Sequence, residues 1–565
     1  MRKIVVIGGV AGGASAAARL RRLDEQAQIV VLERGEHVSF SNCCLPYYLS
    51  GTVPTSEALV MMTPKAFQER HNIEVRVNSE AVEILREEKA VLVREAGGRE
   101  YKESYDKLVL APGARPVVPR SIRGADAPHV FTVRNVGDVR RLKDHVTLHK
   151  VRNVVVAGGG FVGIEVAENL RSAGLEVSLV EGAEQIMAPF DYDMVQILHK
   201  ELIDNGVGLY LSSMLTAING DSVELRRGEE TLTLPAQAVV LAVGVAPETE
   251  LASKAGLELG SRGIKVDHNY RTTDPDIYAV GDAVEYFDRM NRRSGALALA
   301  GPAQRQARAA ADHICGKFSG NRGYIGSSCL RVFAQNAACT GMNEKAAKAA
   351  GIPCEVAYVL PADKVGIMPE SHYMAFKLIF EVPTGRILGA QAIGKGDAVR
   401  RIDVIATLIT MNGTLEDLKE LELCYSPVYG TAKDVVNMAA LVGLNLLNGE
   451  YEQVRLDQVR ALVESGAYIV DVREKAEYDA GHLKNAVNIP LSQFRERLAE
   501  VPRDVPVYLH CRTSQRSYYA LCQLRGNGYR NVKNISGSFL GVCLYEYYND
   551  QTQGRTPIVT AYNFK

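Results

Sequence analysis

Two stretches of the chain share one pattern of apolar and polar positions. Each has a short apolar strand, a glycine-rich turn, a helix and a second apolar strand that ends in glutamate: KIVVIGGVAGGASAAARL leading to IVVLERG, and NVVVAGGGFVGIEVAENL leading to VSLVEGA. In dinucleotide-binding units an acidic residue follows the glycine turn by about 20 residues, as it does in both copies. The repeated pattern therefore predicts two dinucleotide sites on two α/β domains.

The rest of the chain shows other patterns. Residues 105–119 and 238–252 each end an apolar strand in glycine and then proline, as expected where the chain returns to an interrupted nucleotide domain. From about 325 to 447, strands and helices alternate without glycine turns, and after the polar stretch NGEYEQV a small α/β unit begins near 455 with strands AYIVDVR, AVNIP and VPVYLHC. The predicted fold class is α/β, with two Rossmann-like domains, an α+β domain and a C-terminal α/β domain.

Length, charge and cysteine content narrow the class of protein. The 565 residues suffice for several domains, and 65 basic against 66 acidic residues argue against nucleic acid or an anionic membrane as the main partner. The N-terminus begins a strand, and no run reaches the roughly 18 apolar residues of a spanning helix, so we expect a cytoplasmic protein. Ten scattered cysteines suggest neither a disulfide scaffold nor a metal site.

The glycine turns supply candidate cofactor residues. Backbone amides at a helix N-terminus bind pyrophosphate, and a carboxylate after the second strand binds ribose. A structural helix turn is the alternative for the first copy, where Val10 replaces the usual middle glycine. The second copy is complete, and its glutamate favours NADH over NADPH because it repels a 2′-phosphate. The candidates are Gly8, Gly12, Gly13 and Glu33 in the first copy, and Gly158, Gly160, Gly163 and Glu181 in the second.

A third stretch of sequence indicates which dinucleotide each of the two sites binds. TTDPDIYAVGDAVE presents Gly281 and Asp282 at the end of a strand, and it resembles the second FAD fingerprint of disulfide reductases that bind two dinucleotides, in which the aspartate bonds the ribityl chain. A plain β-turn is the alternative. We therefore expect FAD at the first glycine turn and NADH at the second.

The stretch SFSNCCLPYY carries the first candidate catalytic residue. Pro46 lacks an N–H and fits only the first turn of a helix, which sets Cys43 at or just before the helix N-terminus. The helix dipole there is expected to lower the thiol pKa. The alternative is a pair of buried cysteines, and Cys44 is expected to point into the core, although a vicinal disulfide with Cys43 stays open.

With this stretch the chain resembles the coenzyme A disulfide reductases, the single-cysteine branch of the flavoprotein disulfide reductases. The resemblance covers about residues 1–445 and includes LAGPAQRQAR and YSPVYGTAKDVVNMA. Tyr48 stands where related enzymes have a second cysteine. The resemblance implies that Cys43 is the redox nucleophile and cycles through a mixed disulfide with its substrate.

The resemblance also implies site residues by position. Tyr425 and Lys433 match positions that reach the partner subunit's active site, which implies a homodimer. A solvated helix face is the alternative for Arg19 and Arg22, and it is also expected for Arg21, which lies on another side of the helix. The implied coenzyme A contacts are Ser15, Arg19, Arg22, Ser39, Asn42, His71, Arg305 and Lys433; further cofactor contacts are Arg34, Gly113, Glu165, Gly244, Ala298 and Tyr425.

The implied domains are an FAD-binding domain of residues 1–150 and 245–322, an NADH-binding domain of 151–244, a dimerisation domain of 323–447 and a C-terminal domain of 448–565.

The chain departs from its relatives at four places: Ile367-Met368-Pro369-Glu370 replaces Tyr-Tyr-Pro-Gly, Gln304 replaces Asn, His71 replaces Lys, and Cys44 replaces Gly or Ala. These departures leave the preferred substrate open.

The C-terminal domain carries a second reactive cysteine in HCRTSQRSYYALCQL. Cys511 follows an apolar strand, a helix is expected to open near Ser517, and Arg512 and Arg516 flank the sulfur. With DVREKAEYDAGHLKNAVNIP upstream, the region resembles a rhodanese domain, which makes Cys511 a sulfur carrier. Four residues separate Cys511 from Arg516, against five in a related phosphatase loop. A degenerate regulatory rhodanese is the alternative, and Asp471, Arg473 and His482 are expected to be scaffold residues.

Together these features predict reduction of coenzyme A persulfide, or of related low-molecular-weight thiol persulfides, polysulfides or disulfides, by NADH through FAD and Cys43, with release of sulfide. Cys511 would transfer the sulfane sulfur. The competing hypotheses are a coenzyme A disulfide reductase with an accessory rhodanese domain, an NADH oxidase or peroxidase, and a flavin-bearing redox sensor. Val10 argues against the oxidases, which carry His there.

Overall fold

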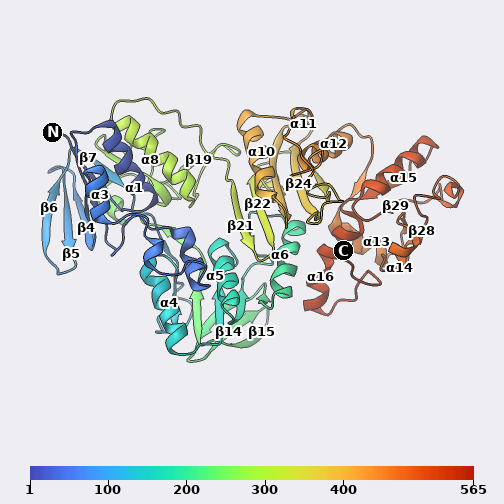
Figure 1. The fold of residues 1–565 in the computed structure, drawn as a ribbon, viewed down its shortest axis with the longest axis horizontal. Coiled ribbons are helices and arrows are strands. Elements are labelled where there is room, and N and C mark those ends of the chain that lie inside the picture. The colour runs from blue at the N-terminus through green and yellow to red at the C-terminus, as the bar shows by residue number, and fades with distance from the viewer. Residues whose placement is uncertain (565) are drawn as a thin grey trace. The chain divides into compact units, whose positions relative to one another are not determined.

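The computed structural model describes residues 1–564. The chain forms two compact units: the first comprises Met1–Glu184 and Tyr210–Tyr324, and the second joins Gln185–Leu209 to the chain from Ile325 onward. Each unit is described by itself below, with the element labels of Figure 1.

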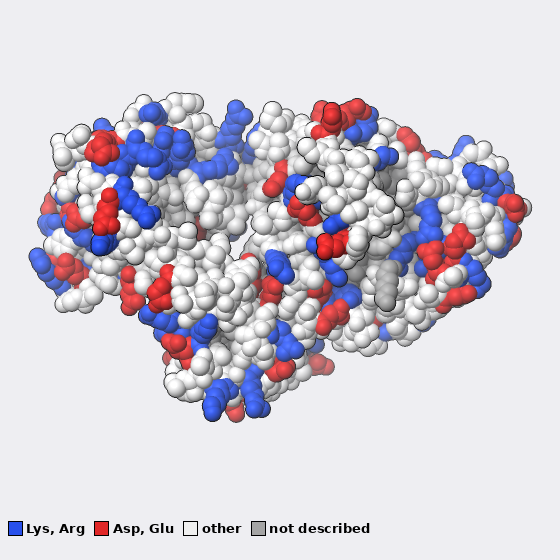
Figure 2. All heavy atoms as spheres, in the orientation of Figure 1, with Lys and Arg blue, Asp and Glu red and all other residues white. Residues whose placement is uncertain are grey.

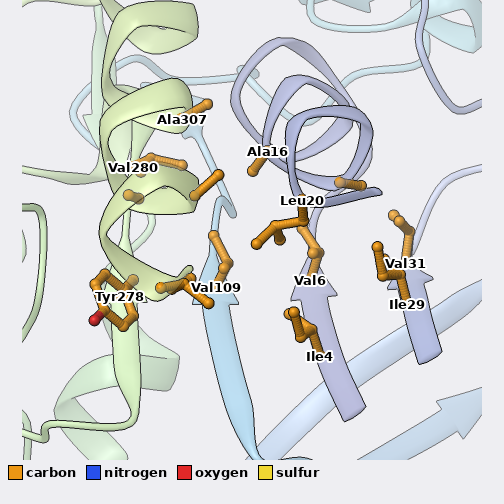
Figure 3. Close-up of a cluster of buried hydrophobic side chains, with 14 of the residues drawn as sticks. Ile4, Val6, Ala16, Leu20, Ile29, Val31, Val109, Tyr278, Val280 and Ala307 are labelled. Carbon is orange, nitrogen blue, oxygen red and sulfur yellow. The ribbon is translucent and has the colours of Figure 1, made fainter. Parts of the chain in front are cut away.

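The first sheet of the N-terminal unit is parallel and has the strand order β18-β7-β1-β2-β3. Its strands are almost continuously apolar because α1 (Ala11–Leu23) and α8 (Ala300–Ile314) cover one face. Figure 3 shows Ala16 and Leu20 of α1 lying over Val6 and Ile4, with Ala307 of α8 near Val280. The strands are β1 (Lys3–Ile7), β2 (Gln28–Leu32), β3 (Glu74–Arg76), β7 (Lys107–Leu110) and β18 (Ile277–Ala279).

A second parallel sheet has the order β12-β11-β10-β16-β9, and α5 (Phe161–Ser172) follows its central strand. The two chain returns that the sequence predicts lie side by side, because β8 (Ala114–Pro116) pairs antiparallel with β17 (Val245–Pro247). The second sheet contains β9 (Val130–Phe131), β10 (Asn153–Ala157), β11 (Glu176–Val180), β12 (Gly208–Tyr210) and β16 (Ala238–Leu241).

Smaller elements complete this unit. Two three-stranded antiparallel sheets and one hairpin extend from the parallel sheets. They comprise β4 (Ser79–Leu85), β5 (Ala90–Glu95), β6 (Glu100–Ser104), β13 (Met214–Ile218), β14 (Ser222–Arg227), β15 (Glu230–Pro235), β19 (Tyr286–Asp288) and β20 (Arg293–Gly295); the other helices are α2 (Leu45–Leu49), α3 (Pro64–His71), α4 (Val136–Leu148) and α7 (Glu250–Lys254).

The second unit begins with an antiparallel sheet of order β21-β22-β25-β24-β23. Its inner strands β24 (Met374–Glu381) and β25 (Ile387–Gly394) are buried along nearly their whole length between helices. The outer strands are β21 (Ser328–Val332), β22 (Gln335–Gly341) and β23 (Cys354–Val359), and the helices are α6 (Tyr192–Asp204), α9 (Glu344–Ala349), α10 (Ala398–Met411), α11 (Leu415–Lys419) and α12 (Val435–Leu447).

A parallel sheet of order β26-β30-β29-β27-β28 ends the unit. Three of its strands are those that the sequence predicts, and the α/β fold class is confirmed. The strands are β26 (Gln453–Val454), β27 (Tyr468–Asp471), β28 (Val487–Asn488), β29 (Val507–His510) and β30 (Val532–Ile535), with helices α13 (Leu456–Glu464), α14 (Lys475–Asp479), α15 (Gln515–Gly526) and α16 (Ser538–Gln553). None of the helices within residues 1–564 is both long enough and apolar enough to cross a membrane.

Candidate active sites

A cavity of about 750 Å³ opens at the first glycine turn, at the carboxyl ends of the first parallel sheet. Four further segments line it: Glu33–His37 after β2, Ser79–Val82 in β4, Arg134–Gly137 before and in α4, and Gly281–Asp282 after β18. The predicted residues Arg34, Gly113 and Asn42 also lie in this wall. The size of this cavity and its place at the carboxyl ends of a parallel sheet fit an FAD-sized dinucleotide.

Segments of backbone pass very close to one another in the first glycine turn. Gly8 has φ of +95°, and a Cβ atom there would lie 2.1 Å from the Ala111 carbonyl oxygen; a Cβ at Gly13 would lie 1.7 Å from the Gly8 carbonyl oxygen. Glu33 is fixed by its neighbours, because the amides of Gly9 and Gly35 each donate to its carboxylate at 2.8 Å. The turn therefore presents helix amides and one ordered carboxylate to a ligand.

The second turn repeats this construction. Gly158 has φ of +111°, and the amides of Gly159 and Ala183 donate to the Glu181 carboxylate at 2.6 and 2.8 Å. A Cβ at Gly160 would meet no atom of the protein within 4 Å. The open space at Gly160 and the fixed Glu181 suit a nicotinamide dinucleotide without a 2′-phosphate.

Cys43 lies in a short 3₁₀ turn, Asn42–Cys44, directly before α2, with Pro46 in the first turn as predicted. Cys43 is exposed, Cys44 is half-buried, and all ten cysteines are free thiols. The Cys44 side chain is therefore not fully in the core. The Oδ1 atom of Asn42 is buried, lines the cavity and has no hydrogen-bond partner within residues 1–564, so it is available to a ligand.

The pKa of the Cys43 thiol is shifted in the direction opposite to the sequence prediction. Burial of the sulfur raises the pKa of the Cys43 thiol, and the charges of Glu165, Cys44 and Asp282 act in the same direction. The expected lowering by a helix dipole is wrong, because α2 has only five residues and two carboxylates oppose it. Burial, with the charge of Glu168, raises the pKa of Glu165 to about 7, and burial raises that of Asp282 against the charge of Arg134.

Most of the predicted coenzyme A residues lie on α1, on α8, at the end of α3 and in the segment before Cys43. Figure 2 shows Lys and Arg side chains gathered over α8. Arg22 is exposed, whereas Arg19 forms an ion pair with Asp312 of α8 at 2.6 Å. The Arg305 guanidinium lies 4.7 Å above the ring of Tyr324. Ser15 and Ser39 are half-buried, as is His71, and Ala298 is exposed.

The expectation for Arg21 is wrong. Its side chain is only 5% exposed and donates to the carbonyl oxygens of His71, Asn72, Asp24 and Glu25 at 2.7–3.1 Å. Arg21 thus ties the end of α1 to the end of α3. Since α3 ends at His71, this contact also positions one predicted substrate residue.

Two predicted residues belong to the second unit. Tyr425 is 50% exposed, and Lys433 is exposed just before α12. Ile367, in the segment that departs from the relatives, is 89% exposed. These side chains are accessible to a second molecule.

Cys511 follows β29 and is only 1% exposed. Its amide donates to Ser538 Oγ at 3.1 Å, its carbonyl oxygen accepts from the Phe539 amide at 3.1 Å, and Ser517 Oγ lies 3.6 Å from its sulfur. Helix α15 begins at Gln515, two residues before the predicted start, because Ser514 takes a left-handed conformation as the cap. The reactive loop is therefore shorter and tighter than expected.

The two arginines beside Cys511 have other partners. Arg516 forms a bidentate pair with Glu477 at 2.6 and 2.7 Å, and Arg512 donates to the carbonyl oxygen of Asn563 at 2.9 Å. The Arg516 charge still interacts with Cys511. Glu477, on a different helix, was not predicted.

The scaffold residues of this domain form a buried network. Arg473 donates to the Asp471 carboxylate at 2.6 Å, and both side chains are almost fully buried. Asp471 ends β27 and lies opposite His510 of β29 in the sheet. His482 stacks on Tyr478 with ring centroids 3.7 Å apart. These contacts hold the strand that carries Cys511 and agree with the predicted structural role.

Some site residues were not identified from the sequence. Arg134 lines the large cavity beside Gly113, and Gln306 accepts from the Gly281 amide at 2.6 Å. Asn135 caps α4 by accepting from the Asp138 amide at 2.9 Å. A cap residue before a helical pattern, as in FTVRNVGDV, is the signal that marks the Arg134 turn.

The chain matches sequence profiles of known protein families along most of its length. The sequence profile of pyridine nucleotide-disulphide oxidoreductases matches residues 2–307, that of their dimerisation domain residues 330–434, and that of rhodanese-like domains residues 455–544. The chain belongs to the pyridine nucleotide-disulphide oxidoreductase family and is an oxidoreductase. The predictions of FAD and NAD(H) as cofactors are confirmed for this family, and the residues of both glycine turns fit them.

Individual relatives share much of the chain. The coenzyme A disulfide reductase of Staphylococcus epidermidis is 30% identical over 442 residues, which are 78% of this chain and 99% of the relative. The structure of reduced CoADR-RHD from Bacillus anthracis is 43% identical with a TM-score of 0.92, covering 97% of this chain and 98% of that chain. The NAD-dependent persulfide reductase of A. fulgidus is 33% identical with a TM-score of 0.90, covering 95% and 99%.

Proposed function

We propose that the protein is an NADH- and FAD-dependent reductase of coenzyme A persulfide and related thiol persulfides, and that its rhodanese domain transfers sulfane sulfur through Cys511. The observation that carries the proposal is the presence in one chain of an exposed cysteine, Cys43, directly after Asn42 of the large cavity, and of a second cysteine, Cys511, in a hydrogen-bonded loop of the C-terminal domain. The persulfide reductase of A. fulgidus, which spans the same domains, supports it.

Cys43 performs the first step of the proposed reaction. Its thiolate attacks the persulfide sulfur that is bonded to coenzyme A, a new disulfide forms between Cys43 and coenzyme A, and hydrosulfide leaves with the electron pair of the broken S–S bond. When FAD is bound, two electrons from NADH would be available through it to cleave the mixed disulfide, which would restore the Cys43 thiolate and release coenzyme A as its thiolate. Tyr48 replaces the second cysteine of related enzymes, so the internal disulfide that those enzymes form between these two positions cannot compete with the mixed disulfide.

Glu165 is suited to proton transfer at this site. With a pKa of about 7 it is partly protonated at neutral pH, and its charge acts directly on Cys43. A protonated Glu165 favours the Cys43 thiolate and provides a proton for the departing sulfur. Asn42, with its unpaired buried oxygen, contributes to positioning the ligand.

We further propose that the active enzyme is a homodimer in which Tyr425 and Lys433 complete the partner's site. Both side chains are exposed in the region that matches the dimerisation domain. The coenzyme A moiety would bind near Arg22 and Arg305, whose guanidinium groups suit its phosphates, and near His71.

The test is sulfide release from several persulfides by the wild type, Cys43→Ser and Cys511→Ser. Loss of NADH-dependent sulfide release in Cys43→Ser, with loss of thiosulfate sulfurtransferase activity only in Cys511→Ser, supports the proposal. Full activity in Cys43→Ser would contradict the proposal. That result is expected if the protein is instead a flavin-bearing redox sensor, whose activity does not depend on this cysteine.

A further inference from the structure

The second unit contains a cavity of about 500 Å³ that has no role in the reaction proposed above. Its walls come from α6, from the segment 362–373, from Lys395 after β25, and from α16 with the end of the chain. A volume of this size lies within the usual range for small-molecule sites.

The cavity adjoins the reactive loop of the rhodanese domain. Leu540, in its wall, donates its amide to the carbonyl oxygen of Arg512 at 3.1 Å, one residue after Cys511. On the other side, Arg512 donates to the carbonyl oxygen of Asn563, next to the wall residue Phe564. The cavity therefore opens beside the segment that carries the sulfur.

Two lysines line the cavity together with His372. Lys200 forms an ion pair with Asp204, whereas no carboxylate within residues 1–564 lies at ion-pairing distance from Lys395. The acidic wall residue Glu201 is already engaged, because its carboxylate accepts from the Ala334 amide at 3.0 Å and from the Gln335 side chain at 3.3 Å. An anionic ligand would thus find one unpaired ammonium and few repelling charges.

Aromatic surfaces complete the cavity. The Lys200 ammonium lies 4.2 Å from the centre of the Phe564 ring, which packs edge-on against Tyr547 with centroids 5.2 Å apart. Tyr373 is partly exposed at the opposite wall. Fixed aromatic rings beside ammonium groups suit a ligand that has both a planar base and phosphates.

We propose that this cavity is the docking site for a phosphorylated thiol of the coenzyme A class, which exchanges sulfane sulfur with Cys511. The proposal rests on the sulfurtransferase role proposed for Cys511. The acceptor thiolate attacks the terminal sulfur of the Cys511 persulfide, an S–S bond forms on the acceptor, and the electron pair of the broken bond returns to the Cys511 thiolate. No further oxidant or reductant is needed.

The test measures sulfur transfer by the full-length holoenzyme from thiosulfate to two acceptors, without NADH. Coenzyme A is compared with pantetheine, which has the same thiol arm but no phosphates or adenine. The measured quantity is the ratio of kcat/KM for coenzyme A to kcat/KM for pantetheine. In Lys395→Glu this ratio is expected to fall by about 10-fold, because the KM for coenzyme A rises when one charge-assisted contact is lost. Lys395→Gln is expected to lose less, in the same direction.

Lys348→Glu is the matched control, because Lys348 is exposed in the same unit and lies outside the cavity. Its acceptor preference should not change, and pantetheine turnover should be unaltered in every variant. An unchanged preference in both Lys395 variants, or an equal change in the control, overturns the docking site. If the wild type transfers sulfur to neither acceptor, the proposed role of Cys511 fails as well.

Discussion

Cys43 and Cys511 lie in two different environments. Cys43 is exposed and follows Asn42 of the large cavity, and the charges of Glu165 and Asp282 disfavour its thiolate. Cys511 is buried and is held by an amide contact to one serine and by the hydroxyl of another. The first geometry admits a bulky thiol and requires activation, whereas the second suits storage of a single sulfur atom.

The first prediction separates these roles. Cys43→Ser should lower NADH-dependent persulfide reduction by about 1,000-fold or more, because the nucleophile is lost, and should leave sulfur transfer from thiosulfate unchanged. Cys511→Ser should give the reverse pattern with a preformed persulfide as substrate. Parallel assays of both reactions check this, and a single variant that abolishes both would contradict the separation.

The second prediction concerns the charge of Glu165. Above pH 7 its carboxylate is ionised and raises the pKa of the Cys43 thiol, so Glu165→Gln should lower the pH midpoint of Cys43 alkylation by iodoacetamide. Peptide mass spectrometry isolates Cys43 from the other cysteines. Glu184→Gln, an exposed carboxylate after the second turn, is the control and should leave the midpoint in place.

The same residue predicts a stability difference with pH. The folded-state pKa of Glu165 is about 7, above its ordinary 4.5, so its contribution to stability is complete below pH 4.5 and is lost as pH rises through 7. Glu165→Gln avoids this cost, at most about 3 kcal/mol. Its free energy of unfolding relative to wild type should therefore be more favourable at pH 8 than at pH 5. An equal difference at both pH values would contradict the assignment.

At the scale of elements, the two glycine turns distinguish glycines that shape the backbone from those that leave room for a ligand. Gly158 has positive φ, and a Cβ there would lie 2.2 Å from the Ala242 carbonyl oxygen, while Gly160 faces open space. Both lie in the same turn before α5. A dinucleotide bound over this turn would occupy the space that a side chain at Gly160 would need.

A matched pair of substitutions tests this distinction. Gly158→Ala should destabilise the fold by about 2 kcal/mol or more, because the backbone must move. Gly160→Ala should keep the thermal midpoint of wild type and raise the KM for NADH by about 10-fold, since the Cβ meets only the ligand. An unchanged KM in Gly160→Ala would mean that the pyrophosphate does not pass over this turn.

The elements also show what the sequence can and cannot predict. Apolar strands, both glycine turns and the turn that carries Cys43 follow from local patterns, and the structure has them as expected. The ion pair of Arg19 with Asp312 joins residues 293 positions apart, which no local pattern encodes. The raised pKa of the Cys43 thiol likewise depends on Glu165, which approaches it only in the folded chain.

At the scale of the whole molecule, a buried charge cluster joins parts of the second unit that are distant in sequence. The Lys377 ammonium, on β24, lies 2.7 Å from Asp193 and 3.2 Å from Asp191 of the α6 region, and it also contacts Glu344 of α9. Glu344 in turn pairs with Arg455 at the start of the rhodanese domain. Lys377 occupies the position between three carboxylates where a cation would otherwise bind.

Removal of this ammonium should be costly. Lys377→Met leaves three carboxylates without their common partner, and the expected loss is about 3–5 kcal/mol, seen as a fall of about 5–10 °C in the thermal midpoint. Lys348→Met, at an exposed site, is the control and should change the midpoint little. A midpoint unchanged in Lys377→Met would show that the cluster does not hold these elements together.

In the proposed reaction, the reductase part of the chain uses sulfane sulfur, the kind of sulfur that the rhodanese domain is proposed to transfer. The most direct test is the anaerobic initial rate of NADH oxidation with coenzyme A persulfide and with coenzyme A disulfide at equal concentrations, with sulfide measured in parallel. We predict a kcat/KM at least about 10-fold higher for the persulfide, a difference of about 1.4 kcal/mol, and one sulfide released for each NADH oxidised. A preference for the disulfide, or NADH oxidation without sulfide, would contradict the account.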